Sequence, residues 1–312
     1  MSPTRRRATA LLLGSALGVG GLTACGSDKP EKSDGEPASA RHTPAAGTTH
    51  VHRVELRGAV NVRDLGGYRT ADGRVVRHGR VFRAGSLAKL TPADLRTLAA
   101  LQLHTVVDLR VPAELRFDGA DRLPHGLTVT SRPVDDTGLF QAMQSAVATR
   151  NPAEQRKRLG DGKAEHRMRE IYPGFVANAR NRAHFKAVLA DIAHDGRLPL
   201  LFHCTSGKDR TGWLSYLLLR LLGVPHSAAV QDYLLSNTLR RPADAKVNAG
   251  LRKAGMMRDT DLLRPLQDVR TSYLEAGLSA LRKEYGGIQG YLTKGLGLDE
   301  ATLGRIRARL LR

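Results

Sequence analysis

Cysteine is scarce in this chain of 312 residues, which contains only Cys25 and Cys204. Two cysteines cannot build a disulfide-rich scaffold or a zinc site with four cysteine ligands. The eleven histidines form no HExxH motif and no cluster with cysteine, so we expect no metal and no cofactor. Aromatic residues are also few, but 41% hydrophobic and 25% charged residues are typical of a globular protein, which excludes disorder throughout.

The first 25 residues lack a hydrophobic run that is long enough to span a bilayer, which takes about 20 residues. The apolar run of residues 11–22 follows three arginines and ends in LTAC (residues 22–25), which resembles the lipobox of bacterial lipoproteins. We predict a lipoprotein signal peptide over residues 1–25, lipidation of Cys25, and export by the general or the twin-arginine route. The protein would then be anchored to the outer face of the bacterial cytoplasmic membrane, or be secreted. A plain signal peptide with an incidental cysteine is the alternative.

Acidic residues are outnumbered, since 49 Lys and Arg stand against 30 Asp and Glu and give a net charge of +19. Cleavage before Cys25 would remove three arginines and lower the charge to +16. This excess favours anionic partners such as a membrane surface or phosphorylated substrates. No nucleic-acid motif or basic patch interleaved with aromatics appears, so we expect no nucleic-acid partner. Residues 26–51 are polar and have almost no large apolar side chain, which predicts a flexible tether.

The pattern of regular elements after residue 52 alternates between strands and helices. Short β-branched or apolar runs predict strands over residues 54–56, 75–82, 104–109, 127–134 and 198–203. Helical spacing predicts a helix capped by Thr91 and helices over residues 184–193, 208–222 and 301–311. We therefore predict an α/β fold with a mainly parallel central sheet, flanking helices and a helical C-terminal part. Residues 52–312 would form one domain, with residues 138–182 as a helical cap or insertion.

The most informative segment is HCTSGKDRTG, residues 203–212, between an apolar strand and the start of a helix. A turn of this kind directs several backbone N–H groups toward one point, and the helix N-terminus adds about half a positive charge there. A tetrahedral oxyanion fits such a cradle. Cys204 at its base is expected to be a thiolate and therefore a nucleophile. Arg210 is placed for bidentate contact with two phosphate oxygens.

This segment resembles the signature of the cysteine-dependent phosphatases, and in particular the atypical bacterial tyrosine and lipid phosphatases with an HCxxGKDRTG loop. Further elements of that family match in the same order. They are NVRDLGG (residues 61–67), FRAGSL (82–87), DLR (108–110) with Glu114 behind it, and a YL plus GLG stretch near the end (291–297). The agreement covers residues 57 to 311, and it implies the cysteine-phosphatase fold.

The resemblance also implies residue roles. Cys204 would attack phosphorus and form a phosphocysteine, while Thr205, Ser206, Gly207, Lys208, Asp209 and Arg210 would bind the phosphate. Thr211 would stabilise the departing thiolate, and His203, Asn61, Arg63 and Asp64 would support the loop. A lysine at the place of Lys208 resembles phosphoinositide phosphatases, so the expected substrates are phosphoproteins and phosphoinositides.

The general acid is not identified by the sequence. Ordinary members of the family carry an aspartate on a Trp-Pro-Asp loop, but Trp213 is the one tryptophan here and lies behind the cysteine loop. Asp209 is the first candidate, because it lies in the loop itself. Asp108 is the second, because it ends a strand. Asp135 and Asp136, after Pro133, are the third.

Four alternatives follow from the same residues. Cys204 can be a buried structural cysteine, and Asp108 and Arg110 can form a buried ion pair without a role in catalysis. A rhodanese-like sulfurtransferase also presents a thiolate in a cradle, but its loop ordinarily lacks the arginine in sixth place. A non-enzymatic lipoprotein that binds anionic phospholipid would use the basic charge alone. The oligomeric state is left open.

Overall fold

The computed structural model describes residues 52–312. The predicted signal peptide, the lipidation site at Cys25 and the polar tether lie outside the described residues and stay predictions. Within residues 52–312, no helix combines the length and the apolar character that crossing a membrane requires.

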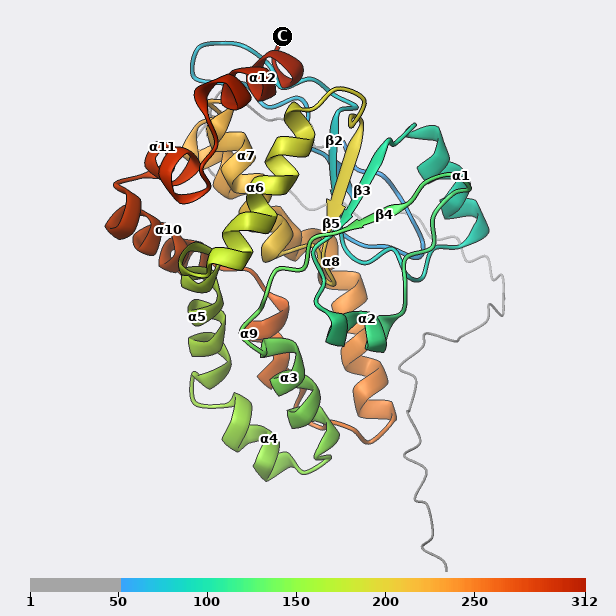
Figure 1. The fold of residues 1–312 in the computed structure, drawn as a ribbon. Coiled ribbons are helices and arrows are strands. Elements are labelled where there is room, and N and C mark those ends of the chain that lie inside the picture. Colours follow the sequence, from blue (N-terminus) through green and yellow to red (C-terminus); the bar gives the residue numbers. More distant parts are fainter. Residues whose placement is uncertain (1–51) are drawn as a thin grey trace, which may run out of the picture. The chain divides into compact units, whose positions relative to one another are not determined.

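A five-stranded sheet forms the centre of the domain, with the order β1-β2-β5-β3-β4 (Figure 1). The strands are β1 (Arg63–Asp64), β2 (Val81–Ala84), β3 (Thr105–Asp108), β4 (Val129–Ser131) and β5 (Leu200–His203). Four neighbouring strands, β2, β5, β3 and β4, run parallel to one another. The edge strand β1 is antiparallel to β2. The predicted α/β class with a mainly parallel sheet is therefore confirmed.

Helices make up most of the remaining domain (Figure 1). They are α1 (Pro92–Ala100), α2 (Pro112–Asp118), α3 (Leu139–Ala148), α4 (Pro152–Leu159), α5 (Lys163–Ala177), α6 (Ala179–Ala193), α7 (Arg210–Leu221), α8 (His226–Lys253), α9 (Arg264–Gln267), α10 (Thr271–Tyr285), α11 (Ile288–Gly290) and α12 (Glu300–Leu310). Two short helical turns, η1 (Thr260–Leu263) and η2 (Tyr291–Gly295), complete the C-terminal part, which is helical as predicted.

Alternate residues of β5 face two separate hydrophobic cores. Leu200 and Phe202 belong to the larger core, which also contains buried residues of α5, α6, α7, α10 and α12. Leu201 belongs to a smaller core that includes Leu98 of α1. Successive side chains of a strand point to opposite faces of the sheet, so a strand covered on both faces must be apolar throughout. This is why residues 198–202 form an uninterrupted apolar run.

Most of the predicted elements are present. Helix α1 begins after Thr91, whose hydroxyl accepts a hydrogen bond from the Asp94 N–H at 3.2 Å, as its capping sequence predicts. Strands β3, β4 and β5 lie inside their predicted ranges. The prediction of a strand over residues 54–56 is wrong, and that over 75–82 is correct only for its last two residues. Isolated backbone pairings occur beside the sheet instead, at Arg53–Arg63 just before the first segment and at Arg69–Val75 and Val76–Leu311 in the second.

The carboxyl ends of the parallel strands are level. His203 is in register with Ala84 on one side and with Asp108 on the other, and Asp108 is in register with Ser131. The loops that follow these strands therefore start at one edge of the sheet, which is where open parallel sheets bind their ligands.

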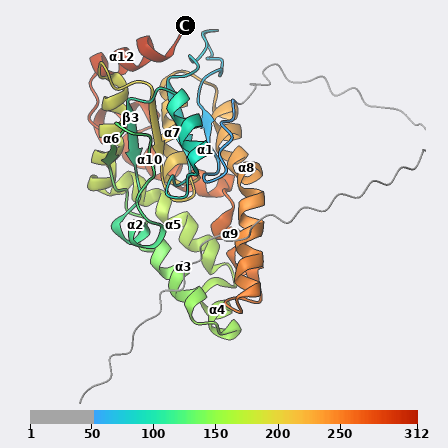
Figure 2. The same ribbon diagram turned by 90° about the vertical axis from the view of Figure 1, so that its right-hand side faces the viewer.

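Helices α3, α4 and α9 lie beyond this edge, in the lower half of Figure 1, and the long helix α8 runs along one side of the domain down to α4 (Figure 2). Residues 139–177, within the predicted cap, form α3, α4 and α5. Helix α5 packs on α10, with Met168 and Phe175 fully buried in the larger core. The C-terminal half of this segment is thus part of the core of the domain.

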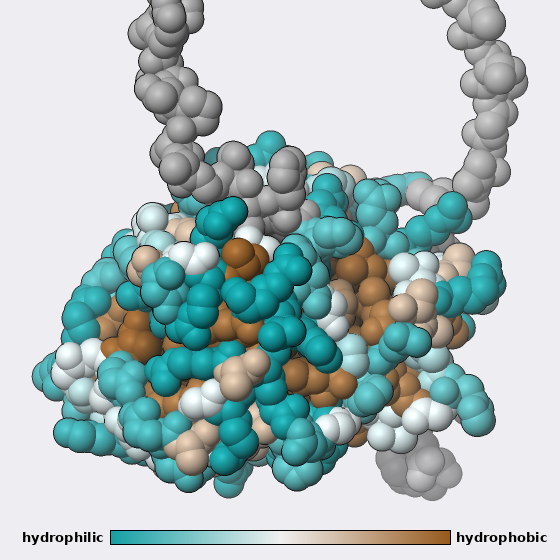
Figure 3. All heavy atoms as spheres, turned by 90° about the horizontal axis from the view of Figure 1, so that it is seen from above, coloured by the Kyte–Doolittle hydropathy of each residue, from teal (hydrophilic) through white to brown (hydrophobic). Residues whose placement is uncertain are grey.

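Hydrophilic residues cover most of the face seen from above, and hydrophobic residues form separate patches between them (Figure 3). Among residues 52–312, the exposed large hydrophobic side chains are Phe117, Val129 and Val247, with exposed fractions of 47%, 39% and 49%.

Candidate active site

The segment from Cys204 to Arg210 connects β5 to α7 at the carboxyl edge of the sheet. Cys204 directly follows the last residue of β5, and Arg210 is the first residue of α7. Gly207 has a φ of +64°, and a Cβ at this position would lie 2.4 Å from the carbonyl oxygen of Ala84, so only glycine fits. Cys204 is a free thiol, and it is 1% exposed.

The backbone N–H groups of this loop are available to a ligand. In the part of the chain that the structure describes, none of the N–H groups of residues 205–209 donates a hydrogen bond. Buried amides are normally paired, so a run of unpaired ones at a helix N-terminus indicates a site for an anion. The predicted oxyanion cradle thus has its donors free.

The Arg210 guanidinium is held by Glu114 of α2. Two hydrogen bonds join them, from Nη1 to Oε2 at 2.6 Å and from Nη2 to Oε1 at 2.5 Å. Thr205 of the loop also donates its hydroxyl to Glu114 at 2.5 Å. Burial raises the pKa of Glu114, but the charge of Arg210 and these hydrogen bonds outweigh it and hold the pKa below its usual range. Glu114 therefore fixes both ends of the loop.

Two side chains, from Asn61 and Arg83, donate hydrogen bonds to the middle of the loop. Asn61 donates its amide to the Gly207 carbonyl at 2.7 Å, and Arg83 of β2 donates to the same oxygen at 2.8 Å. Arg63 in turn donates to the Asn61 side chain at 2.5 Å. Asn61 and Arg63 thus lie where the resemblance predicts loop support. Asp64 does not contact the loop; it accepts from the N–H groups of Gly66 and Gly79.

Asp232 of α8 is the counter-ion of this supporting pair. Its carboxylate accepts from Arg63 at 2.8 Å and from Arg83 at 2.6 Å, and all three side chains are buried. Burial raises the pKa of Asp232, but the two guanidinium groups outweigh it and lower the pKa to about 2. The support of Gly207 therefore rests on an ion-pair network that is buried from solvent.

Lys208 and Asp209 pair with each other. The Lys208 ammonium lies 2.9 Å from the Asp209 carboxylate and donates to the backbone carbonyl of Asp268 at 3.1 Å. Asp209 also accepts from the hydroxyl of Tyr172 at 2.9 Å, which lies 2.6 Å from the Tyr233 hydroxyl. The charge of Lys208 is thus neutralised within the loop, and its ammonium group links the loop to the segment between α9 and α10.

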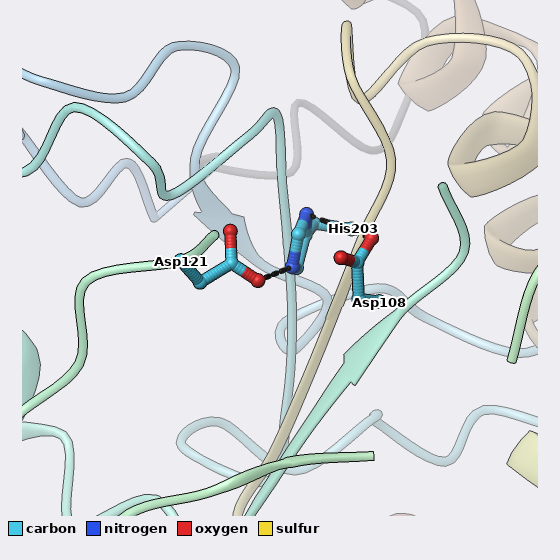
Figure 4. A group of neighbouring side chains, drawn as sticks. All are labelled: Asp108, Asp121 and His203. Atoms are coloured by element: carbon cyan, nitrogen blue, oxygen red, sulfur yellow. Dashed lines mark hydrogen bonds and ion pairs between the residues drawn. The ribbon is translucent and has the colours of Figure 1, made fainter. Parts of the chain in front are cut away.

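Asp108 pairs with Arg110, which agrees with the alternative that these residues form a buried ion pair. Arg110 donates to Asp108 at 2.9 Å and to Asp121 at 2.7 Å. Asp121 also lies 2.8 Å from Nε2 of His203, and Figure 4 shows Asp108, Asp121 and His203 together. Ligand atoms of Asp108, Asp121 and His203 lie within 4.8 Å of one another, which is close enough for a metal ion. The Arg110 guanidinium already supplies the positive charge between the two carboxylates, so an ion would have to displace it.

Asp136 is buried between β4 and α3, whereas its neighbour Asp135 is exposed. Its carboxylate caps α3 by accepting from the N–H groups of Gly138 at 3.1 Å and Phe140 at 3.0 Å. Burial raises the pKa of Asp136, and the nearby charge of Arg210 only partly offsets the rise. The Asp136 carboxyl group therefore stays protonated to higher pH than that of an ordinary aspartic acid, and it lies close enough to Arg210 to feel its charge.

The remaining predicted residues differ in their surroundings. The hydroxyl of Thr211, on the first turn of α7, is buried and has no hydrogen-bond partner within residues 52–312. Such a hydroxyl is free to donate to the thiolate or to a ligand. Ser206 is held through its backbone, because its carbonyl accepts from Arg240 of α8 at 3.0 Å.

Several residues of this site cannot be identified from the sequence alone. Glu114 was recognised as part of a family motif, but its pairing with Arg210 joins residues 96 positions apart. Arg83, Asp121, Asp232 and Tyr172 lie on other elements and carry no local signal that relates them to the loop.

The fold and the loop together define an α/β protein with an oxyanion cradle and a buried cysteine at the carboxyl edge of its sheet. Residues 54–312 match the model of the tyrosine phosphatase family. A protein of Cupriavidus necator named as a tyrosine-protein phosphatase is 33% identical over 83% of this chain and 89% of its own length. The triple specificity protein phosphatase PtpB of Mycobacterium tuberculosis is 32% identical over 82% of this chain and 98% of its own length. A tyrosine-protein phosphatase of Nostoc commune is 31% identical over 73% of each chain.

The chain therefore belongs to the tyrosine phosphatase family, and it is a protein-tyrosine-phosphatase.

Proposed function

We propose that this enzyme hydrolyses phosphate monoesters through a covalent phosphocysteine at Cys204. The observation that carries the proposal is the arrangement of the loop, in which a buried thiol precedes five unpaired backbone N–H groups and an arginine. These groups can bind the three non-bridging oxygens of a phosphate and direct its phosphorus toward sulfur. Because Glu114 holds Arg210 in place before substrate arrives, little reorganisation is needed for binding.

In the first step, the Cys204 thiolate attacks phosphorus and the bond between phosphorus and the ester oxygen breaks. The leaving oxygen needs a proton, and Asp136 is the best-placed donor because it is buried beside Arg210 and its pKa is raised. Asp209 and Asp108 are less suited to this role, since each is engaged by a cation, Lys208 or Arg110. We therefore prefer Asp136, from the third pair of candidates, to Asp209 and Asp108 as the general acid.

In the second step, water attacks the phosphocysteine, its proton passes to the Asp136 carboxylate, and the sulfur–phosphorus bond breaks. The electron pair returns to Cys204, and the unpaired hydroxyl of Thr211 can donate to the departing thiolate. Inorganic phosphate is then released. Over the two steps, the proton that Asp136 gives to the leaving oxygen is replaced by one from the attacking water, and the electron pair with which Cys204 attacks phosphorus returns to its sulfur.

An aromatic pair beside the cradle favours aryl phosphates as substrates. Phe117 of α2 and Phe140 of α3 have ring centroids 5.5 Å apart at 69°, and Phe117 is 47% exposed. Phe117 lies one helical turn after Glu114, and the backbone of Phe140 contacts Asp136. The pair thus lies on the same two elements as Glu114 and the cap formed by Asp136, and we expect it to pack against the ring of phosphotyrosine.

We extend the proposal to phosphoserine, phosphothreonine and phosphoinositides, because one relative is named a triple specificity phosphatase. The resemblance of Lys208 to phosphoinositide phosphatases supports lipid substrates, but its ammonium must leave Asp209 to meet a second phosphate. Turnover of phosphotyrosyl peptide and of phosphoinositide should be compared for wild type and Lys208→Ala. A selective loss of lipid turnover is expected, and an equal loss on both substrates would remove this role for Lys208.

We also propose that the enzyme acts outside the cytoplasm, tethered to the membrane through a lipid on Cys25. The support is that residues 1–25 contain three arginines, an apolar run and the LTAC segment, and that residues 26–51 are polar. Metabolic labelling with a fatty-acid analogue should label wild type and not Cys25→Ala. Labelling that persists in Cys25→Ala would contradict the anchor.

The main proposal is tested with the chain from residue 26 onward and p-nitrophenyl phosphate as substrate. We expect turnover to continue in EDTA and to be lost in Cys204→Ser. Activity that EDTA abolishes, or a Cys204→Ser variant that stays active, would overturn the mechanism.

A further inference from the structure

One end of the domain is strongly basic. It is the end at which the parallel strands begin, and residues 69–80, 194–197 and 305–312 form it. These 24 residues contain nine arginines, two aspartates and neither lysine nor glutamate, so they carry +7 of the net charge of +19 of the whole chain. Figure 3 looks onto this end of the domain and shows a face that is mostly hydrophilic.

Backbone pairing and one ion pair hold the three segments together. Val75 and Arg312 exchange two backbone hydrogen bonds, of 2.9 and 3.0 Å, and Arg69 pairs with Val75 from the other side. Directly opposite residues of antiparallel strands place their side chains on the same face, so Arg69 and Arg312 flank Val75 on one face. Arg309 of α12 pairs with Asp195, which ties the C-terminal segment to the turn before β5.

Most of these arginines have no acidic partner. Within residues 52–312, ion pairs engage Arg74, Arg197 and Arg309. The other six form none there, and four of the six are exposed, namely Arg69, Arg80, Arg305 and Arg312. Like charges that are gathered without counter-charges repel one another and oppose folding. The arrangement is therefore better explained by an anionic partner than by the stability of the domain.

This basic end and the catalytic loop lie at opposite ends of the sheet. Strand β5 begins shortly after residues 194–197 and ends next to Cys204. Helix α7 then runs back over 12 residues, or about 18 Å, and the carbonyl of its last residue, Leu221, accepts from Arg307 at 3.3 Å. Figure 1 shows α12 at the top and β5 pointing away from it toward the loop. An anion bound at the basic end is thus separate from a phosphate in the cradle.

The described part of the chain also begins on this half of the domain. The carbonyl of His52 accepts from the N–H of Asp64 at 2.9 Å, and the ring centroid of His52 lies 5.6 Å from that of His78. The proposed tether, residues 26–51, would span about 30 Å as a flexible chain. A lipid on Cys25 would therefore keep the basic end within reach of the membrane that holds the anchor.

We propose that the arginines of residues 69–80 and 305–312 form a docking surface for the anionic headgroups of a phospholipid membrane. The inference rests on the proposed lipid anchor for its cellular setting, but not on phosphatase turnover. Each arginine close to an anionic bilayer strengthens binding by about fivefold, so several together hold the domain in one orientation. Docked in this way, the enzyme turns Cys204 away from the bilayer, and its substrates are phosphorylated proteins or lipids of an opposing membrane.

The test measures co-sedimentation with vesicles of phosphatidylcholine, with and without phosphatidylglycerol. It uses the chain from residue 26 onward, which keeps the whole described domain and carries no lipid. A triple variant removes three exposed charges that form no ion pair within residues 52–312, through Arg69→Gln, Arg80→Gln and Arg305→Gln. The matched control removes three exposed cations of α8, beyond the other end of the sheet, through Arg241→Gln, Lys246→Gln and Lys253→Gln.

We expect wild type to bind only the vesicles that contain phosphatidylglycerol, and added salt to release it. The triple variant should bind about a hundredfold more weakly, which is fivefold for each arginine. The α8 control should bind nearly as tightly as wild type. Amide hydrogen exchange of the wild-type chain provides a measurement that needs no variant, and the vesicles should protect residues 69–80 and 305–312.

Three outcomes would overturn the proposal. They are wild-type binding that does not depend on phosphatidylglycerol, an equal loss in both triple variants, and protection by the vesicles of α8 in place of residues 69–80 and 305–312. The first includes a chain that binds no vesicle, in which case the basic end serves another partner, such as an acidic protein. Turnover of p-nitrophenyl phosphate is measured separately on the same samples. A wild-type chain that binds vesicles but has no turnover would count against the proposed function instead.

Discussion

The Glu114 carboxylate grips the Arg210 guanidinium through two hydrogen bonds of 2.5 and 2.6 Å, with both side chains almost fully buried. Removing one partner of a buried ion pair leaves the other charge uncompensated, which typically costs 3 to 5 kcal/mol. We expect Glu114→Gln to lower the free energy of unfolding at pH 7 by about this amount and to weaken phosphate binding. Urea denaturation and inhibition by inorganic phosphate measure the two effects.

The pH dependence of this loss provides its control. The folded-state pKa of Glu114 is lowered, so its contribution is complete above the unfolded value of about 4.3 and is lost as the pH falls through the folded value. The difference between wild type and Glu114→Gln should therefore be constant near neutral pH and shrink below about pH 4. A difference that stays unchanged at pH 3 would assign it to packing.

Asp136→Asn tests the general acid. Because the pKa of Asp136 is raised, its proton is available to higher pH than in an ordinary aspartic acid, and the variant should lose the alkaline limb of the pH–rate profile. We expect phosphotyrosine turnover to fall by about 10² to 10⁴ and p-nitrophenyl phosphate, with its better leaving group, to suffer less. Asp209→Asn is the comparison, and the same leaving-group dependence in that variant alone would move the role to Asp209.

Asp136→Asn should also change how the thermal stability of the protein depends on pH. Because the folded-state pKa of Asp136 is raised, its carboxyl contributes stability that is complete below the unfolded pKa and is lost as the pH rises through the folded value. Asparagine keeps only one of the two acceptors that cap α3, but it has no charge to bury. The loss of melting temperature in Asp136→Asn should therefore be smaller at pH 7 than at pH 3, which differential scanning calorimetry can check.

The pair of Phe117 and Phe140 is expected to select for aryl phosphates. Phe117→Ala should lower kcat/KM for a phosphotyrosyl peptide by roughly 3- to 10-fold, the value of one aromatic contact, and leave the matching phosphoseryl peptide nearly unchanged. Val129→Ala is the control, since Val129 is also an exposed hydrophobic residue but lies on β4. Equal losses on both peptides would mean that the pair supports α2 and α3 only.

Asp232 is expected to support the loop from a distance. Asp232→Asn leaves the guanidinium groups of Arg63 and Arg83 buried without their shared carboxylate, so we expect a loss of about 3 to 5 kcal/mol at pH 7 and weaker phosphate binding through Gly207. The loss should vanish as the pH falls from about 3.9 toward the folded-state pKa of about 2. Asp195→Asn, which removes an exposed partner of Arg309, should cost almost nothing. A comparable loss in Asp195→Asn would contradict this account.

The sequence predicted those parts of the molecule that local chemistry determines. Strand β5, the loop after it and helix α7 are contiguous, and the cap of α1 by Thr91 depends on four neighbouring residues. The opening of the domain was not predicted well, because Val54 and Val75 are β-branched but lie beside the sheet edge rather than in a full ladder. Burial and pairing decide whether a short β-prone run becomes a strand.

The partners of the loop could not be predicted, because they are set by tertiary contacts. Glu114 reaches Arg210 only because strands β3 and β5 end level with each other. The choice among Asp209, Asp108 and Asp136 depends on which carboxylate is engaged by a cation, and the pairing of Lys208 with Asp209 became visible only in the structure. Spacing along the chain contains no information of this kind.

The central claim is the covalent phosphocysteine, and trapping it is the most direct test. Asp136→Asn should form the intermediate from p-nitrophenyl phosphate, which needs little acid assistance, but hydrolyse it slowly because the base for water is missing. After an acid quench during turnover, peptide mass spectrometry should locate one phosphoryl group on Cys204. Turnover without any label on Cys204, or a label on another residue, would contradict the account.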